Sequence, residues 1–339
     1  MSASERWRAD KSREWLAGQP WLMGFNFVPS TAVNTTEMWQ AETFDPATIR
    51  RELGWAKDIG FNSTRVFLQY LVWKRDPQGL LERFRIFLDA AHGLGLSVVP
   101  VLFDDCAFGE PKQLDPFSGP QKEPTPGMIL SSWTPSPGRR LGTDPAEKPL
   151  LRTYVQDILR TFSPHPAVLF WDLFNEPLGP AQVGEASFLI ELFSWARQAA
   201  PSQPLTVGGF ADNSSLHPVL HENSDLLTFH SYEPLEGLKK IAAGLKAKGY
   251  PVICTEWMAR PYGSRFDTDL PFFREENIGC YQWGLVNGRT QCQFPWSNKP
   301  GDPIPEGGWF HDLLHPDGTP YRVEEVETIR RLAPAPQNA

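Results

Sequence analysis

The stretch "AVLFWDLFNEP", Ala167–Pro177, carries the pattern that decides the fold. Residues 167–174 are almost entirely apolar, which is typical of a strand that is covered on both faces in a parallel sheet. The run passes directly into Asn175 and Glu176. A carboxylate at the end of a buried strand is unfavourable unless it has a partner or a chemical use. Glu176 therefore requires a partner elsewhere in the chain.

The same pattern recurs along the chain, where apolar runs alternate with segments of helical, 3.6-residue period. The predicted strands are 21–27, 62–68, 97–103, 167–174, 204–209, 226–232, 251–257 and 278–285. The predicted helices lie near 46–59, 80–91, 150–162, 188–196, 214–222, 238–245, 269–276 and 323–332. Eight strand–helix units of this kind predict an α/β fold, a (β/α)8 TIM barrel that forms a single domain over residues 1–339.

Two long segments interrupt the alternation. Residues 104–146 are rich in proline and glycine, and they are either a lid loop or a sign of a misplaced element. Residues 287–320 form a second long loop after the eighth strand. Both segments follow the carboxyl end of a strand, which is the face of such barrels where active sites lie. Three tryptophans in these loops either line a sugar site or fasten the loops to the barrel: Trp133, Trp296 and Trp309.

Composition and charge exclude several classes of function. The 339 residues carry a net charge of −8, whereas proteins that bind nucleic acid or anionic membranes have basic surfaces. No apolar run approaches the ~18 residues of a membrane span. The charged amino-terminal residues lack the apolar stretch of a signal peptide, so the predicted location is cytoplasmic. Neither a CxxC pair nor an HxH or HExxH motif occurs, so no metal and no cofactor is predicted, and no pattern specifies an oligomeric state.

A second strand-end glutamate supplies the partner for the first. Glu256 ends the seventh predicted strand in "ICTEWMARPYG". In a barrel, Glu176 and Glu256 project from the same rim although they are 80 residues apart in sequence. Two carboxylates at one cavity are what glycosidic cleavage needs, one to protonate the leaving oxygen and one to attack the anomeric carbon. A salt bridge at the mouth of the barrel is the alternative interpretation of each glutamate alone.

"WDLFNEP" followed by "TEW" resembles the clan A glycoside hydrolases, which are retaining enzymes on a (β/α)8 barrel, and is most similar to the cellulase-type members of family 5. The resemblance implies that Glu176 is the acid/base and Glu256 the nucleophile. It further implies that five residues bind substrate or support these two: Arg65 paired with the nucleophile, Asn175 at the sugar 2-hydroxyl, His230, Tyr232 touching the nucleophile, and Trp283 as the floor under the sugar ring.

The chain departs from the family pattern at one place. Many family 5 members have a histidine at the end of the third strand, whereas this strand ends in "VLFDDC" with Asp104 and Asp105. These aspartates either bind sugar hydroxyls or cap the loop that follows. Near the end of the first strand, Asn26 and Trp39 are further candidates for contact with sugar, and Asn26 is the stronger of the two.

The predicted function is that of a retaining β-glycosidase acting on β-linked glycosides or oligosaccharides by double displacement. The missing signal peptide and the two long rim loops favour short substrates that are trimmed from one end. One alternative is an endo-β-1,4-glycanase of the cellulase, mannanase or xylanase type. The other is a barrel that binds carbohydrate without turning it over. The sequence does not distinguish gluco, manno, galacto and xylo substrates.

Overall fold

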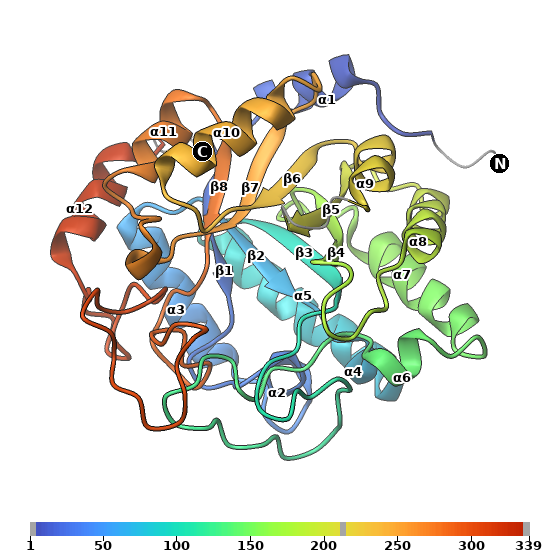
Figure 1. Cartoon of the computed structure of the whole chain (residues 1–339). Helices are drawn as coiled ribbons and strands as arrows, with labels where there is room; N and C mark the ends of the chain where they lie inside the picture. The colour runs from blue at the N-terminus through green and yellow to red at the C-terminus, as the bar shows by residue number, and fades with distance from the viewer. Residues whose placement is uncertain (1–4, 211–214, 335–339) are drawn as a thin grey trace.

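The computed structural model describes residues 5–210 and 215–334, and eight parallel strands in it close into a barrel in chain order, β1 to β8 (Figure 1). The barrel closes where β1 pairs with β8. The strands are β1 Met23–Phe27, β2 Ser63–Phe67, β3 Ser97–Asp104, β4 Trp171–Asn175, β5 Leu205–Phe210, β6 Leu227–His230, β7 Val252–Trp257 and β8 Gly279–Gln282. The predicted (β/α)8 TIM barrel is therefore confirmed.

Helices surround the barrel. They are α1 Ala9–Ala17, α2 Thr35–Trp39, α3 Pro46–Ile59, α4 Tyr70–Arg75, α5 Pro77–Gly93, α6 Arg139–Gly142, α7 Lys148–Phe162, α8 Ala186–Gln198, α9 His217–Asn223, α10 Leu235–Lys246, α11 Asp269–Glu275 and α12 Val323–Leu332, with a 3-10 turn at Arg260–Tyr262. All eight predicted helices are present, although the start predicted for α9, Ser214, lies outside the described residues. Within the described ranges, no helix is long and apolar enough to cross a membrane.

Local sequence explains where the helices begin and end. In α3, the Asp45 side chain accepts a hydrogen bond from the Thr48 amide at the start of the helix, and Pro46 occupies the first turn. The helix ends at Gly60, whose φ of 118° is accessible to glycine at little cost. Along α7, the side chains of Leu151, Tyr154, Val155, Ile158, Leu159 and Phe162 are buried against the barrel. The cap and the glycine thus define the ends of α3, and the apolar stripe holds α7 against the barrel.

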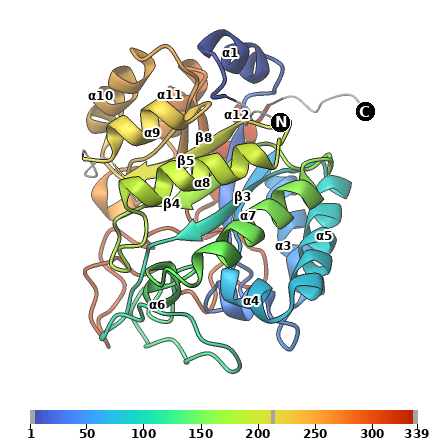
Figure 2. The same ribbon diagram turned by 90° about the vertical axis from the view of Figure 1, so that its right-hand side faces the viewer.

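The amino-terminal end of the barrel is closed by apolar packing. Trp15 and Leu16 of α1 pack on a buried cluster that includes Leu22, Phe170 and Ile253. The helix α1 was not expected from the sequence pattern. Figures 1 and 2 place it on the side of the molecule opposite the two long loops. The open face is therefore at the carboxyl ends of the strands.

The two long loops are real excursions and lie side by side (Figures 1 and 2). Between β3 and α7 the short helix α6 is the one helix, so no barrel element was misplaced there. Leu130 of the first loop donates its amide to the Thr290 carbonyl of the second at 2.8 Å. The Gln291 side chain bonds the Thr125 and Met128 carbonyls. These bonds join the two loops into one wall above the barrel.

Candidate active site

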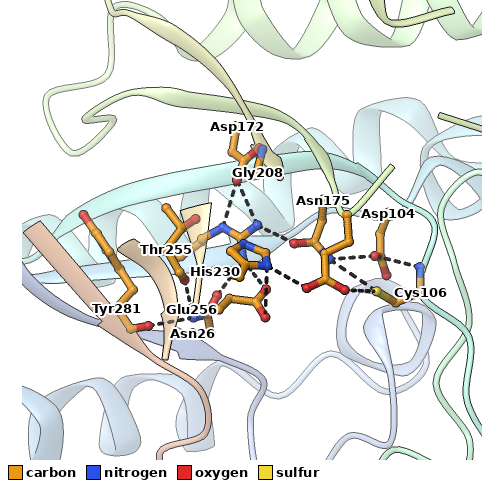
Figure 3. A network of polar contacts seen from close by, with 12 residues as sticks. Asn26, Asp104, Cys106, Asp172, Asn175, Gly208, His230, Thr255, Glu256 and Tyr281 are labelled. Carbon is orange, nitrogen blue, oxygen red and sulfur yellow. Dashed lines mark hydrogen bonds and ion pairs between the residues drawn. The ribbon is translucent and has the colours of Figure 1, made fainter. Parts of the chain in front are cut away.

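The guanidinium of Arg65, on β2, is at the centre of a polar network at the carboxyl end of the barrel. Figure 3 labels its partners Asp172, Asn175 and Glu256. It is fully buried, and all five of its N–H groups are used. Nε and Nη2 donate to Asp172 Oδ2 at 3.0 and 2.8 Å, and Nη2 also donates to Asn175 Oδ1 at 2.7 Å. Nη1 donates to Glu256 Oε1 at 2.7 Å and to Asn26 Oδ1 at 2.8 Å. Such a network holds the guanidinium in one orientation.

Irregularities in strand pairing bring these partners inward. The register of β4 against β5 shifts between Asp172 and Asn175. Because side chains of a regular strand alternate between its faces, residues three apart would point to opposite sides, whereas both of these bond Arg65. The register of β7 against β8 shifts likewise between Cys254 and Trp257, around Glu256. These two shifts in register direct the polar groups toward one point.

Glu256 is buried and its two oxygens have different partners. Oε1 accepts from Arg65, and Oε2 accepts from the Tyr232 hydroxyl at 2.8 Å. Burial raises the pKa of Glu256, while the Arg65 guanidinium and the Tyr232 hydroxyl act in the opposite direction. Both partners stabilise the ionised carboxylate. The contact of Tyr232 with this residue agrees with the geometry implied by the family resemblance.

Glu176 follows β4 and has few partners that favour its charged form. Its Oε1 lies 2.7 Å from His230 Nδ1, and its Oε2 accepts from the Cys106 thiol at 3.1 Å. Burial raises the pKa of Glu176, and no cation bonds its carboxyl directly. Burial also lowers the pKa of His230 to about 4, so this imidazole is neutral near pH 7. Glu176 thus lacks the direct bond to a guanidinium that Glu256 has in Arg65.

The backbone at Glu176 is held in an unusual conformation. Its φ is 44°, in the left-handed region that non-glycine residues rarely adopt. The Glu176 amide donates to the Gly208 carbonyl at 2.9 Å. Asp105 stabilises the following turn by accepting the backbone amides of Leu178, Val183 and Gly184 at 2.9 to 3.1 Å. Asp105 therefore supports the segment that carries Glu176.

Asp104 links the third strand to both the site and the lid loop. Its Oδ1 accepts from Asn175 Nδ2 at 2.9 Å, and its Oδ2 accepts from Trp133 Nε1 at 2.8 Å. Burial raises the pKa of Asp104 to about 6, against the effect of these hydrogen bonds. Because Asn175 Oδ1 accepts from Arg65 and Asn175 Nδ2 donates to Asp104, the orientation of the Asn175 amide is fixed.

A cavity of about 220 Å³ opens above Glu176 and Glu256. Aromatic and apolar side chains from the barrel and from both long loops form most of its wall. The lining residues are Phe67, Asp104, Cys106, Phe108, Leu130, Trp133, Asn175, Glu176, Tyr232, Glu256, Trp283, Trp296 and His311. Pockets for drug-sized ligands hold about 300–1,000 Å³, so this cavity suits a small, compact group.

Most of the predicted site residues come together at this cavity. Asp104, Asn175, Glu176, Tyr232, Glu256 and Trp283 line it. Arg65 and His230 lie directly behind the two glutamates. Trp133 and Trp296 line the wall, whereas Trp309 stacks on Tyr321 away from it. The two loops therefore contribute side chains as well as backbone to the site.

Three candidates for sugar contact have other roles. Asn26 is buried and does not line the cavity, because its amide nitrogen bonds the Thr255 and Gln282 carbonyls and its oxygen bonds Arg65. Trp39 is fully buried and donates to the Phe67 carbonyl. Asp105 accepts backbone amides of the turn after β4, and not of the loop after β3 that the capping alternative named. None of Asn26, Trp39 and Asp105 lines the cavity, and their contact with substrate stays a prediction.

Sequence reasoning missed three residues of the network. Asp172 lies within the opening stretch, and a single acid in an apolar strand was the available signal for a buried cation partner. Gly208 packs so closely that a Cβ there would lie 3.1 to 3.2 Å from Asp172, Arg65 and His230. Cys106 follows the two aspartates in "VLFDDC", and nothing in the pattern indicated its contact with Glu176.

One group of side chains in the described residues has the composition of a metal site. Glu176, His230 and Glu256 each offer one ligand atom, and these atoms lie within 4.8 Å of one another. The same atoms are engaged within the protein, since the carboxylate of Glu256 bonds Arg65 and Tyr232. A divalent cation would have to compete with the guanidinium for this carboxylate.

Comparison with known proteins finds glycoside hydrolase barrels that are similar to this chain. Residues 131–290 match the model of "Glycosyl hydrolases family 2, TIM barrel domain". No curated protein matches. The crystal structure of a glycoside hydrolase family 5 mannosidase from Rhizomucor miehei has a TM-score of 0.60 at 15% identity, covering 93% of each chain.

Two further solved structures are similar. The exo-beta-1,4-mannosidase Op5Man5 from Opitutaceae bacterium strain TAV5 has a TM-score of 0.63 at 21% identity, over 98% of this chain and 62% of that one. The endo-beta-1,4-mannanase from Thermotoga petrophila has a TM-score of 0.60 at 16% identity, over 94% and 77%. The expected similarity to glycoside hydrolase barrels is supported by these matches. At these identities the solved structures establish a shared fold.

Proposed function

We propose that the protein is a retaining β-glycosidase with Glu256 as nucleophile and Glu176 as acid/base. The observation that carries this proposal is the contrast between two carboxyls at one cavity. Glu256 is held by Arg65 and the Tyr232 hydroxyl, whereas Glu176 is bonded by neutral groups. One carboxyl is thus prepared to attack as an anion and the other to donate a proton.

The separation of the two carboxyls supports retention of configuration. One oxygen of Glu176 lies within 4.8 Å of one oxygen of Glu256. Retaining enzymes place their carboxyl groups about 5–5.5 Å apart, whereas inverting enzymes need about 6.5–9.5 Å to admit a water molecule. A nearest approach of this size agrees with the shorter spacing, in which Glu256 attacks the anomeric carbon directly.

In the proposed reaction, Glu256 attacks the anomeric carbon while Glu176 protonates the departing glycosidic oxygen. A covalent glycosyl-enzyme forms at Glu256. Glu176, now ionised, takes a proton from water, which displaces Glu256 and restores both groups. Trp283 provides an aromatic surface beside the cavity for the apolar face of the sugar ring.

We infer that the substrate is a terminal β-mannoside and that the enzyme acts from the chain end. The similar structures are a mannosidase, an exo-mannosidase and an endo-mannanase by their names. The cavity is small and is walled by two loops that hydrogen-bond one another, which favours one terminal sugar over a long chain. The cytoplasmic location stays a prediction, which cell fractionation tests.

The endo-acting alternative is kept because one of the similar proteins is named an endo-mannanase. Aryl β-glycosides of mannose, glucose, galactose and xylose test the sugar, and mannohexaose tests the mode of cleavage. We expect hydrolysis of the aryl mannoside and release of mannose from the hexamer from the first time point. Early products of two to four sugars would indicate internal cleavage.

Two isosteric variants provide the control for this screen. Glu256→Gln removes the proposed nucleophile and should abolish hydrolysis. Glu52→Gln alters a second buried glutamate, which bonds Ser30 and does not line the cavity, and should leave activity in place. If the protein hydrolyses none of these substrates but binds mannose, the interpretation as an inert carbohydrate-binding barrel replaces the proposal.

A further inference from the structure

Cys106 lies at the wall of the cavity, in contact with Glu176. Its Sγ is 3.1 Å from Glu176 Oε2 and 3.6 Å from Asn175 Nδ2. The other three cysteines, Cys254, Cys280 and Cys292, are buried, whereas Cys106 is half-buried and lines the cavity. Figure 3 draws the thiol between Asn175 and the neighbouring carboxyl.

The direction of each hydrogen bond at the thiol is determined by its neighbours. The Asn175 amide oxygen accepts from Arg65, so its nitrogen donates, to Asp104 Oδ1 and to the Cys106 sulfur. The thiol hydrogen is then free to donate to Glu176. The Cys106 amide also donates to Asp104 Oδ1 at 3.0 Å, which fixes the backbone beneath the thiol.

The thiol stays protonated while Glu176 titrates. Burial and the adjacent carboxylates hold the pKa of Cys106 well above its usual range. An S–H group is a weak donor, weaker than a hydroxyl. The thiol therefore favours the ionised carboxyl of Glu176, but less than a hydroxyl would, which suits a residue that must hold its proton until substrate arrives and release it during the reaction.

Other groups around Glu176 also affect the protonation of its carboxyl. The nearest titratable side chains are His230 at 2.7 Å, Cys106 at 3.1 Å and Glu256 within 4.8 Å. Arg65, Asp104 and Tyr232 interact with Glu176 through their charges without bonding its carboxyl. Of these, Cys106 and His230 make direct contact with its carboxyl oxygens. Cys106 is the one of the two that can be exchanged for a stronger donor of similar shape.

We propose that Cys106 is a positioning residue whose thiol orients the Glu176 carboxyl and sets the pH at which that carboxyl releases its proton. The inference rests on the proposed glycosidase activity for its kinetic meaning. The effect of the thiol on the pKa of the Glu176 carboxyl can be measured without any turnover. The variants Cys106→Ser and Cys106→Ala change the donor in opposite directions.

The first test titrates Glu176 directly. Protein labelled with ¹³C at the glutamate carboxyl carbons is followed by NMR against pH, and the Glu176 signal is assigned by its loss in Glu176→Gln. Because a neutral hydrogen bond changes a carboxyl pKa by about half a unit to one unit, Cys106→Ser should lower the midpoint and Cys106→Ala should raise it by about that amount. Cys280→Ala removes a buried thiol that has no contact with a carboxyl of the site, and should leave the midpoint unchanged.

The second test uses kinetics. The alkaline limb of kcat/KM should move with the NMR midpoint, down for Cys106→Ser and up for Cys106→Ala. If the substitution moves the Glu176 carboxyl out of place, hydrolysis of phenyl glycosides should slow several-fold more than hydrolysis of dinitrophenyl glycosides, whose leaving group needs no proton. A purely structural role would slow both substrates equally.

The outcomes separate the two proposals. Opposite shifts of the midpoint in Cys106→Ser and Cys106→Ala support the role of Cys106. Midpoints equal to that of the unaltered protein, in either variant that folds, overturn it. If the unaltered protein hydrolyses no glycoside, the proposed function fails, while the NMR titration still decides the role of Cys106.

Discussion

Replacing Arg65 with methionine tests whether this residue keeps Glu256 ionised. The change removes the one cation that bonds both Asp172 and Glu256, two carboxylates that are buried in the barrel. Methionine is similar in length and apolar, so it fills much of the space. Two effects follow, one on stability and one on the pH dependence of activity.

The magnitude of each effect follows from the geometry. Breaking a buried ion pair by removing one partner costs about 3–5 kcal/mol, because an uncompensated charge is left behind. An opposite charge at close range lowers a carboxyl pKa by about 1–3 units, and Nη1 of Arg65 is 2.7 Å from Glu256. Since the nucleophile must be ionised, activity rises as pH increases through the Glu256 pKa. Loss of the cation therefore moves the acidic limb of kcat/KM to higher pH by about 1–3 units.

The assay combines urea denaturation with the pH profile of kcat/KM on the aryl glycoside that the protein cleaves. Arg260→Met is the matched control, because Arg260 is buried and forms a bidentate pair with Glu325 at 2.7 Å outside the cavity. It should lose similar stability without moving the acidic limb. An acidic limb that stays in place in folded Arg65→Met, or that moves equally in the control, would refute the reasoning.

Three further variants probe the support of the site. Gly208→Ala introduces a methyl group 3.1 to 3.2 Å from three side chains of the network, and the forced shift should lower kcat/KM about tenfold, equivalent to about 1.4 kcal/mol, in steady-state assays. Asp105→Ala leaves the backbone amides of the turn after Glu176 without their acceptor, and calorimetry should report a loss of about 2–4 kcal/mol together with lower kcat; unchanged stability would count against its capping role. Tyr232→Phe removes a hydroxyl from Glu256 and should raise the acidic limb by about half a pH unit or more, whereas an unmoved limb would deny that bond any influence.

The barrel was predictable because its signals are local and repeated. Strands buried on both faces read as apolar runs, and the helices between them have one apolar stripe, as α7 does. The short helices α2 and α4 were not predicted, since five or six residues are too few to establish a period. The helix α1 was missed because little of it is apolar and its packing depends on the end of the barrel.

The two glutamates were predictable because strand ends meet at one rim, whereas Arg65, Tyr232 and Trp283 were identified through the resemblance to a known family. The resemblance to a known family added their roles. These positions needed no knowledge of loop geometry. Their distances were not predictable, since they depend on the bulges in β4 and β7.

The remaining site residues depend on contacts that the sequence does not encode locally. Asn26 looked suited to sugar, yet its amide is held by backbone carbonyls of β7 and β8. Asp172 and Cys106 acquire their roles from Arg65 and Glu176, which are far away in the chain. Whether a polar side chain faces the cavity or supports its neighbour is decided by three-dimensional packing.

The central claim is that Glu256 forms a covalent bond to the sugar. A 2-deoxy-2-fluoroglycoside with an activated leaving group, of the sugar that the protein cleaves, tests it most directly. Fluorine slows both formation and breakdown of the intermediate, and the activated leaving group speeds only its formation, so the intermediate accumulates. After digestion, peptide mass spectrometry should find one fluorosugar per chain, attached to Glu256, and none in Glu256→Gln. Inactivation with the label on another residue, or turnover of the parent glycoside with no label and with inverted configuration, would contradict the account.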